Sequence, residues 1–111
     1  MHELGVAQQI VAEVARQAPD QKISEVGVEV GVLSGVVVHA LQYGFGVAKL
    51  GTLLEEATLT VATGLRQAEC ANCKTEFQSD QAWSCCPQCQ SDRVKFRGGD
   101  DVRLLFIEVV E

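Results

Sequence analysis

CANCKTEFQSDQAWSCCPQC, residues 70–89, carries the most specific pattern in this sequence. All five cysteines of the chain lie within it. Four of them form two Cys-x2-Cys pairs that are separated by twelve residues, Cys70 with Cys73 and Cys86 with Cys89. This spacing is typical of a site in which two turns bring four thiolates into a tetrahedron. Because soft thiolates in that geometry favour zinc, the segment predicts a zinc-binding module.

We expect this zinc to be structural, because four thiolates leave no open position for water or substrate. Between the two pairs, few large apolar residues other than Phe77 and Trp83 are present to build a core. Metal binding, roughly 10 to 16 kcal/mol at comparable sites, should therefore supply much of the folding free energy. We leave Cys85 out of the site, because its use instead of Cys86 would give Cys-x3-Cys. A thioredoxin-like redox pair is the weaker alternative, since neither pair opens a helix of a βαβ unit.

Upstream of the cysteines, helical and strand periodicities alternate. Apolar residues recur at helical spacing in residues 4–18 and again in residues 37–51, which predicts two helices that end at Pro19 and Gly51. The first stripe consists of Leu4, Ala7, Val11, Val14 and Ala18. Alternation of period two in residues 25–30 and 58–63 predicts two strands. Residues 64–69 are expected to form the exit from this half.

Downstream, residues 102–110 form a strand that is apolar on both faces, so we expect both faces to be buried. Such a strand should return to the sheet through a hinge at Gly98–Asp101. The predicted fold class is therefore α+β, a small two-helix domain with a roughly three-stranded mixed sheet, interrupted by a zinc-ribbon-like module. Its boundaries are residues 1–67 plus 99–111 for the α+β domain and 68–98 for the zinc module. Edges of so small a sheet invite pairing, and a monomer and a homodimer both fit.

Composition excludes several classes of protein. The 111 residues are 47% hydrophobic, too apolar for a disordered chain, and no run is long enough for a membrane span. The net charge of -6 argues against a duplex nucleic-acid binder. Because MHELGVAQQI lacks the basic start of a signal peptide, we expect a soluble, cytoplasmic protein.

The amino terminus offers a second cluster of metal ligands. The α-amine of Met1, the amide nitrogen of His2 and its imidazole are close enough to chelate one ion, and nitrogen sets of this kind suit square-planar Ni(II) or Cu(II). Taken alone, a frayed terminus with a chance histidine explains the motif better. Glu3 favours the start of the first helix through the helix dipole. His39 is interpreted as a surface or partly buried histidine, and no catalytic set indicates an enzyme.

Together, the two sites resemble the HypA/HybF family of hydrogenase maturation nickel chaperones. The resemblance covers nearly the whole chain and is carried by MHELGVAQQIV (1–11), VGVEVGVLSGV (26–36), ALQYGF (40–45), GTLLEEATLTV (51–61), CANC (70–73), CPQCQS (86–91) and the closing strand. The order and spacing of these segments are specific, although each segment alone is not.

The resemblance implies a protein with two metal sites. Met1 and His2 would hold Ni(II) as cargo, Glu3 would be an auxiliary ligand or partner contact, and Cys70, Cys73, Cys86 and Cys89 would hold structural Zn(II). The implied partners are a HypB-type maturation GTPase, the [NiFe]-hydrogenase large subunit precursor and, in some organisms, urease maturation proteins, with no nucleic acid or membrane.

The chain departs from the family pattern at a few positions. Val37, Val38 and Gly46 stand where many members have an acid. Compared with those members, the departure implies that a carboxylate ligand near the terminus is missing, and that the terminal nitrogen set would then bind nickel without it.

Two other functions stay open. The chain could be a zinc-ribbon adaptor that recruits a protein partner without transferring metal. A single-stranded nucleic-acid contact is the weaker idea, because the four bases of residues 68–97 are matched by four acids.

Overall fold

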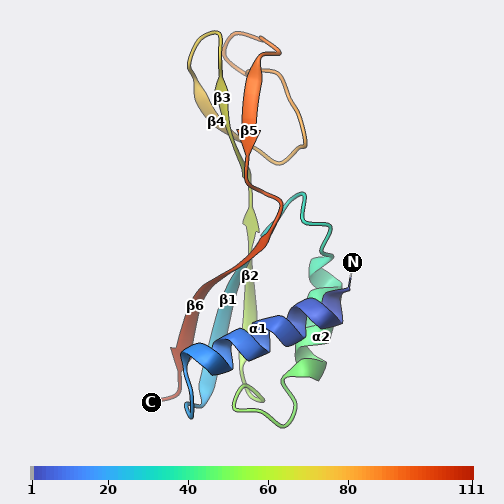
Figure 1. Ribbon diagram of the computed structural model, residues 1–111, viewed down its shortest axis with the longest axis vertical. Helices are drawn as coiled ribbons and strands as arrows, with labels where there is room; N and C mark the ends of the chain where they lie inside the picture. The colour runs from blue at the N-terminus through green and yellow to red at the C-terminus, as the bar shows by residue number, and fades with distance from the viewer. Residues whose placement is uncertain (1) are drawn as a thin grey trace. The chain divides into compact units, whose positions relative to one another are not determined.

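The computed structural model describes residues 2–111, which form two helices and six strands (Figure 1). In chain order these are α1 (Glu3–Gln17), β1 (Ile23–Gly31), α2 (Val38–Ala48), β2 (Thr58–Gly64), β3 (Arg66–Cys70), β4 (Glu76–Ser79), β5 (Val94–Arg97) and β6 (Val102–Val109). The strands make two three-stranded sheets, one in the order β2-β1-β6 and the other in the order β4-β3-β5.

The chain divides into two compact units. The helical unit comprises the residues up to Glu29, Val36–Ala62 and Arg103–Glu111, and the cysteine unit comprises Val30–Gly35 and Thr63–Val102. Segment Val30–Gly35 belongs to the cysteine unit because its backbone is bonded there. The Val32 N–H donates to the Gly64 carbonyl at 2.9 Å, and the Leu33 N–H donates to the Gly99 carbonyl at 2.6 Å.

The first sheet is mixed, as predicted. β1 and β2 run in the same direction and are joined through α2, whereas β6 runs opposite to β1 (Figure 1). Hydrogen bonds fix the β1–β6 register at both ends, from the Val110 N–H to the Lys22 carbonyl and from the Gly31 N–H to the Asp101 carbonyl. The predicted return of the C-terminal strand to the sheet is confirmed.

The core of the helical unit lies between the helices and the first sheet. α1 contributes a buried stripe, and apolar residues of β1, α2, the 54–57 segment and β2 complete it. Leu4, predicted to lie on this stripe, is 46% exposed, so that part of the prediction is wrong. The stripe begins one turn later, at Ala7, because it is the main chain of Leu4 that lies against α2 at Gly44. The core residues are Ala7, Ile10, Val11, Val14, Ile23, Val26, Val28, Leu41, Phe45, Leu54, Ala57 and Leu59.

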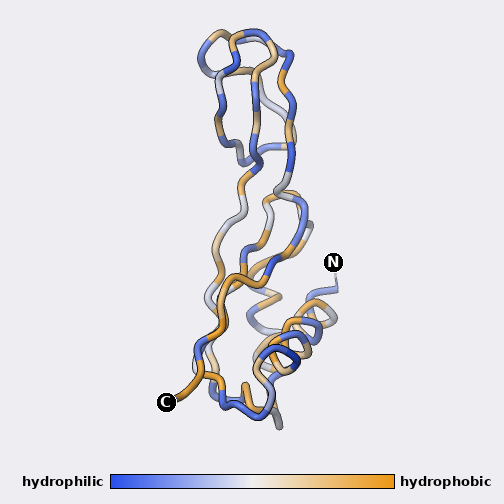
Figure 2. Tube along the Cα trace, turned by 60° about the vertical axis from the view of Figure 1, so that its left-hand side comes forward, coloured by the Kyte–Doolittle hydropathy of each residue, from blue (hydrophilic) through white to orange (hydrophobic). Residues whose placement is uncertain are grey.

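The prediction that both faces of the last strand are buried is also wrong. Leu105 is 46% exposed and Val110 is 49% exposed, and Figure 2 shows the hydrophobic run that ends at the C-terminus. The reason is topological: in the described part of the chain β6 is an edge strand with only β1 beside it, so its side chains lack the neighbours that a second adjacent strand would supply. The Phe106 ring packs over Gly27 of β1, which has no side chain. A Cβ at Gly27 would lie 2.0 Å from the Phe106 ring, so the ring occupies the space that a side chain would fill.

The segment expected to be an exit, residues 64–69, contains all but the last residue of β3, the central strand of the second sheet. Its sequence hides this role, since Arg66, Gln67 and Glu69 are polar. Ala68 is paired with Phe77 of β4 and Phe96 of β5. The two rings meet edge to face, with centroids 6.3 Å apart. The small alanine between them therefore allows an aromatic contact that serves as a core for this sheet.

Arg66 connects three segments of the cysteine unit. Its guanidinium lies 5.3 Å from the centre of the Phe96 ring and donates to the carbonyls of Gly98 at 3.0 Å and Ala82 at 2.9 Å. Gly98 and Gly99, the predicted hinge, both have positive φ angles, of 79° and 78°. Glycine adopts this backbone conformation without steric cost.

Candidate metal centre

Each Cys-x2-Cys pair forms the same backbone turn. In the first turn the Cys70 N–H donates to the Thr75 carbonyl and the Lys74 N–H donates back to the Cys70 carbonyl, both at 2.9 Å. The second turn repeats both bonds at 2.9 Å, with Cys86, Ser91 and Gln90 in the equivalent places. Lys74 and Gln90 share left-handed φ angles of 67° and 65°. The two turns are thus structural repeats, and each points two sulfur atoms to one side.

The four sulfur atoms converge on one point. The Sγ atoms of Cys70, Cys73, Cys86 and Cys89 all lie within 4.8 Å of one another. Across the two turns, Cys70 Sγ is 3.7 Å from Cys89 Sγ and Cys73 Sγ is 3.6 Å from Cys86 Sγ. A tetrahedral ion with bonds of about 2.3 Å requires sulfur atoms about 3.8 Å apart. The arrangement therefore fits a metal ion of the size and geometry of zinc.

The two sulfurs of each turn have different surroundings. The first cysteines, Cys70 and Cys86, are fully buried, whereas Cys73 is exposed and Cys89 is half-buried. Burial raises the pKa of the Cys86 thiol, while the Cys73 N–H lowers the pKa of Cys70. Hydrogen bonds from Thr75 lower the pKa of Cys73 to about 6. Cys73 is thus the thiol most readily held as a thiolate.

Two residues that the sequence reasoning missed contact the ligand sulfurs. The Thr75 hydroxyl lies 3.0 Å from Cys73 Sγ, and the Asn72 side-chain amide donates to Cys89 Sγ at 3.5 Å. Groups of this kind orient metal ligands and adjust their basicity. A signal for Thr75 was available, since Thr75 and Ser91 both follow the second cysteine of their pair by two residues.

Cys85 does not join the cluster. Its side chain is exposed, and the converging set found among residues 2–111 contains the other four cysteines. The neighbouring Cys86 is fully buried, so adjacent residues point in different directions.

The structure places His2 and Glu3 at the start of α1. His2 is the exposed N-cap residue, its carbonyl accepts from the Val6 N–H at 3.0 Å, and its side chain makes no capping bond. Glu3 Oε2 accepts a hydrogen bond from the Val37 N–H at 2.9 Å, and this bond lowers the pKa of Glu3. Met1 lies outside the described residues. Within residues 2–111, no third His, Cys, Asp or Glu side chain completes a metal cluster with His2 and Glu3.

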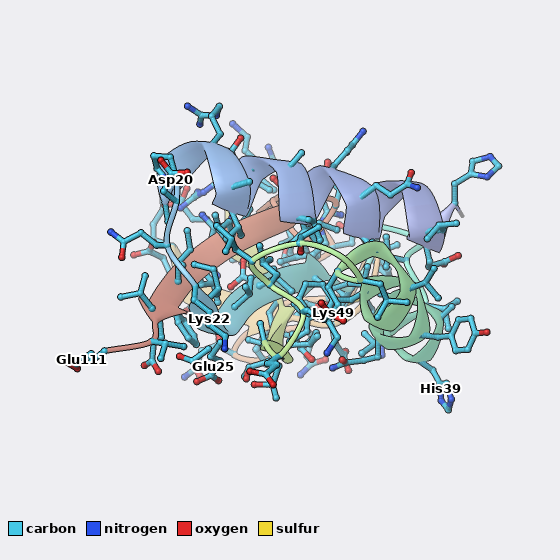
Figure 3. All side chains as sticks on the ribbon, turned by 90° about the horizontal axis from the view of Figure 1, so that it is seen from below. Asp20, Lys22, Glu25, His39, Lys49 and Glu111 are labelled. Atoms are coloured by element: carbon cyan, nitrogen blue, oxygen red, sulfur yellow. The ribbon has the colours of Figure 1, made fainter. Side chains whose placement is uncertain are left out.

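His39 lies on α2 and is exposed, and its ring projects outward (Figure 3). Nothing in its position brings it into the four-cysteine cluster. It is therefore a useful control for experiments on His2.

Comparison with known proteins identifies the family. The family model described as "Hydrogenase/urease nickel incorporation, metallochaperone, hypA" matches residues 1–109. This chain belongs to the HypA family. The hydrogenase maturation factor HypA of Trichodesmium erythraeum is 36% identical over all of this chain and 97% of its own length. The HybF protein of Klebsiella pneumoniae is 35% identical, covering 97% of this chain and 98% of its own length.

A solved structure agrees with this assignment. The solution structure of the Ni metallochaperone HypA from Helicobacter pylori matches with a TM-score of 0.67 and 26% identity, over 99% of this chain and 98% of that one. The predicted α+β class with its four-cysteine module is thus confirmed, as is the predicted family. The HypA family consists of metallochaperones for hydrogenase maturation, so the chain's role is in metal handling. No helix among residues 2–111 is long and apolar enough to cross a membrane.

Proposed function

We propose that the chain binds Ni(II) at its amino terminus and delivers it to the [NiFe]-hydrogenase large subunit precursor in the cytoplasm. Delivery would occur together with a HypB-type GTPase, and urease maturation proteins are further candidate partners. The chain acts by binding and handing over metal, without catalysing a reaction. The observation that carries the proposal is the HypA family match over residues 1–109, which includes His2 at the exposed start of α1.

The proposed nickel ligands are the Met1 amine, the His2 amide nitrogen and the His2 imidazole. For Glu3 the family resemblance implies two alternatives, an auxiliary ligand or a partner contact. The geometry supports the choice of His2, because the first N–H groups of an α-helix have no partner within the helix. The amide nitrogen at this position can therefore bind a metal without the loss of a helical hydrogen bond.

The cysteine unit would hold Zn(II) as structure. Cys70, Cys73, Cys86 and Cys89 are the proposed ligands, because the distances between their sulfurs suit a tetrahedral ion. We propose that the two parts of the chain defined from the sequence bind different metals. Residues 1–67 plus 99–111 would carry nickel, and residues 68–98 would carry zinc.

The test is calorimetric titration of Ni(II) into the zinc-loaded chain and its variants. His2→Ala should abolish stoichiometric nickel binding and leave the zinc content and the fold intact. His39→Ala is the matched control and should bind nickel like the wild type. Undiminished nickel affinity in His2→Ala would refute the proposed site. It would leave the zinc-ribbon adaptor, which recruits a partner without metal transfer, as the better account.

A further inference from the structure

α2 begins without a residue of its own that can cap it. Its N-cap is Val37 and its third helical residue is Ala40, and no side chain caps the helix from the N-cap position. Helices commonly begin with Ser, Thr, Asp or Asn at the N-cap and Glu at the third position, whose carboxylate accepts from the N-cap N–H. The local sequence of α2 supplies neither half of this arrangement.

α1 supplies the missing carboxylate. Glu3 Oε2 accepts from the Val37 N–H at 2.9 Å, which is the bond that a glutamate at the third position of α2 would make. The carboxylate also lies at the positive end of the α2 dipole, where a negative charge is favoured. The capping bond of α2 therefore comes from a residue that lies thirty-four positions earlier in the chain.

Backbone packing fixes the same turn of α1 at a second point. Gly44 of α2 is buried, and a Cβ at this position would lie 3.2 Å from Leu4 Cα and 3.3 Å from the Glu3 carbonyl oxygen. The main chain of Glu3 thus lies against α2 near Gly44, while its side chain reaches the start of α2 at Val37. These two contacts hold the first turn of α1 against α2.

We propose that Glu3 is a positioning residue for the nickel-binding terminus and acts by holding α1 to the start of α2, not by ligating the metal. The effect of this contact on nickel binding rests on the proposed function. His2 directly precedes Glu3, and its carbonyl closes the first helical hydrogen bond with Val6. Fixing Glu3 therefore fixes the direction in which the His2 amide and imidazole leave the helix. Oε2 of Glu3 already accepts the hydrogen bond from the Val37 N–H, and a metal would compete with this donor for the oxygen.

The first experiment needs no nickel. Amide hydrogen exchange is measured by NMR on the zinc-loaded, nickel-free full chain. In Glu3→Ala, exchange at Val37 and at Val6 should each be faster by about fivefold, the effect of losing a helix cap. In Glu3→Gln, whose amide oxygen still accepts from Val37, both should stay within about twofold of the wild type. Unchanged exchange in Glu3→Ala would overturn the proposal.

A rescue variant separates capping of α2 from holding α1. Glu3→Ala combined with Ala40→Glu returns a carboxylate to the third position of α2. Exchange at Val37 should then become slow again, while exchange at Val6 stays fast, because α1 is still detached. Recovery at both amides would show that the Glu3 bond serves α2 alone, and the proposal would be overturned.

Nickel titrations complete the test. The affinity should fall by about fivefold in Glu3→Ala and in the double variant, and stay within about twofold of wild type in Glu3→Gln. An equal loss in Glu3→Gln and Glu3→Ala would identify the carboxylate as a ligand and overturn the positioning role. Absence of nickel binding in the wild type would instead refute the proposed function, and the exchange data would still test the contact between the helices.

Discussion

The hydrogen bond between Glu3 and Val37 should be visible in the titration of a single carboxyl group. The N–H donor stabilises the ionised form, so the pKa of Glu3 should lie below the ordinary value of 4.5. Because the folded-state pKa is lowered, the stabilisation is present above 4.5 and is lost as the pH falls through the folded-state value. NMR titration of the Glu3 side-chain carboxyl carbon measures this pKa. A midpoint at or above 4.5 would show that the bond does not form in solution.

Thr75 should control how tightly Cys73 holds zinc. Its hydroxyl and backbone make the largest contributions to the hydrogen bonding that lowers the pKa of Cys73 to about 6, so they favour the thiolate. Thr75→Val removes the hydroxyl, raises the pKa and should let protons displace zinc at a higher pH. We expect zinc affinity at pH 7 to fall by about tenfold, measured by competition with a chromophoric chelator.

Ser91→Ala is the matched control for Thr75→Val. Ser91 occupies the same place in the second turn, but its hydroxyl accepts from the Arg93 N–H. Zinc affinity should therefore change little. Equal losses in the two variants would show that the effect comes from the turns and not from the contact with Cys73.

At the residue scale, the sequence predicts the four-cysteine cluster well and the terminus less well. Cys-x2-Cys spacing is local, so each turn brings its two sulfurs together independently of how the rest of the chain folds. The bond from Val37 to Glu3 joins residues that only the packing of α1 on α2 brings together. No spacing rule could have indicated that the uncapped start of α2 and the acid at position 3 belong to one contact.

At the scale of the element, two glycines of α2 should respond differently to alanine. Among the described residues, a Cβ at Gly46 would meet no heavy atom within 4 Å apart from its own helix backbone and chain neighbours. Gly46→Ala should therefore raise the free energy of unfolding by about 1 kcal/mol through helix propensity. A Cβ at Gly44 would press on the backbone of Leu4 and Glu3. Gly44→Ala should therefore lose this gain or reverse it. Urea unfolding curves measure both, and an equal gain in the two variants would contradict the close packing of the helices.

The strands show where periodicity is and is not informative. The alternation of Val26 and Val28 with polar residues predicted β1 correctly, because a strand with one buried face has this pattern. The apolar run in β6 was misleading, because an edge strand has a neighbouring strand on one side only and its apolar side chains stay partly exposed. β3 was missed for the opposite reason. Its partners Phe77 and Phe96 supply the apolar contacts, so Ala68 alone carries little signal.

At the scale of the whole molecule, zinc removal should affect the two compact units differently. The cysteine unit has a small apolar core around Ala68, whereas the helical unit buries residues from both helices and the first sheet. A chelator should therefore raise hydrogen exchange throughout β3, β4 and β5 and leave α1 and α2 protected. Exchange mass spectrometry with peptide resolution measures this. Simultaneous loss of protection in α1 and α2 would show that the units do not fold separately.

Nickel delivery can be measured as transfer of the ion from this chain to the hydrogenase large subunit precursor. The zinc-loaded chain carrying one equivalent of Ni(II) is mixed with the purified precursor and a HypB-type GTPase, in the presence of a chelator that captures free nickel. The precursor is then isolated and its nickel content is measured. We expect nickel in the precursor with the wild-type chain and with His39→Ala, and none with His2→Ala. Equal nickel content with all three chains, or none with the wild type, would contradict this expectation.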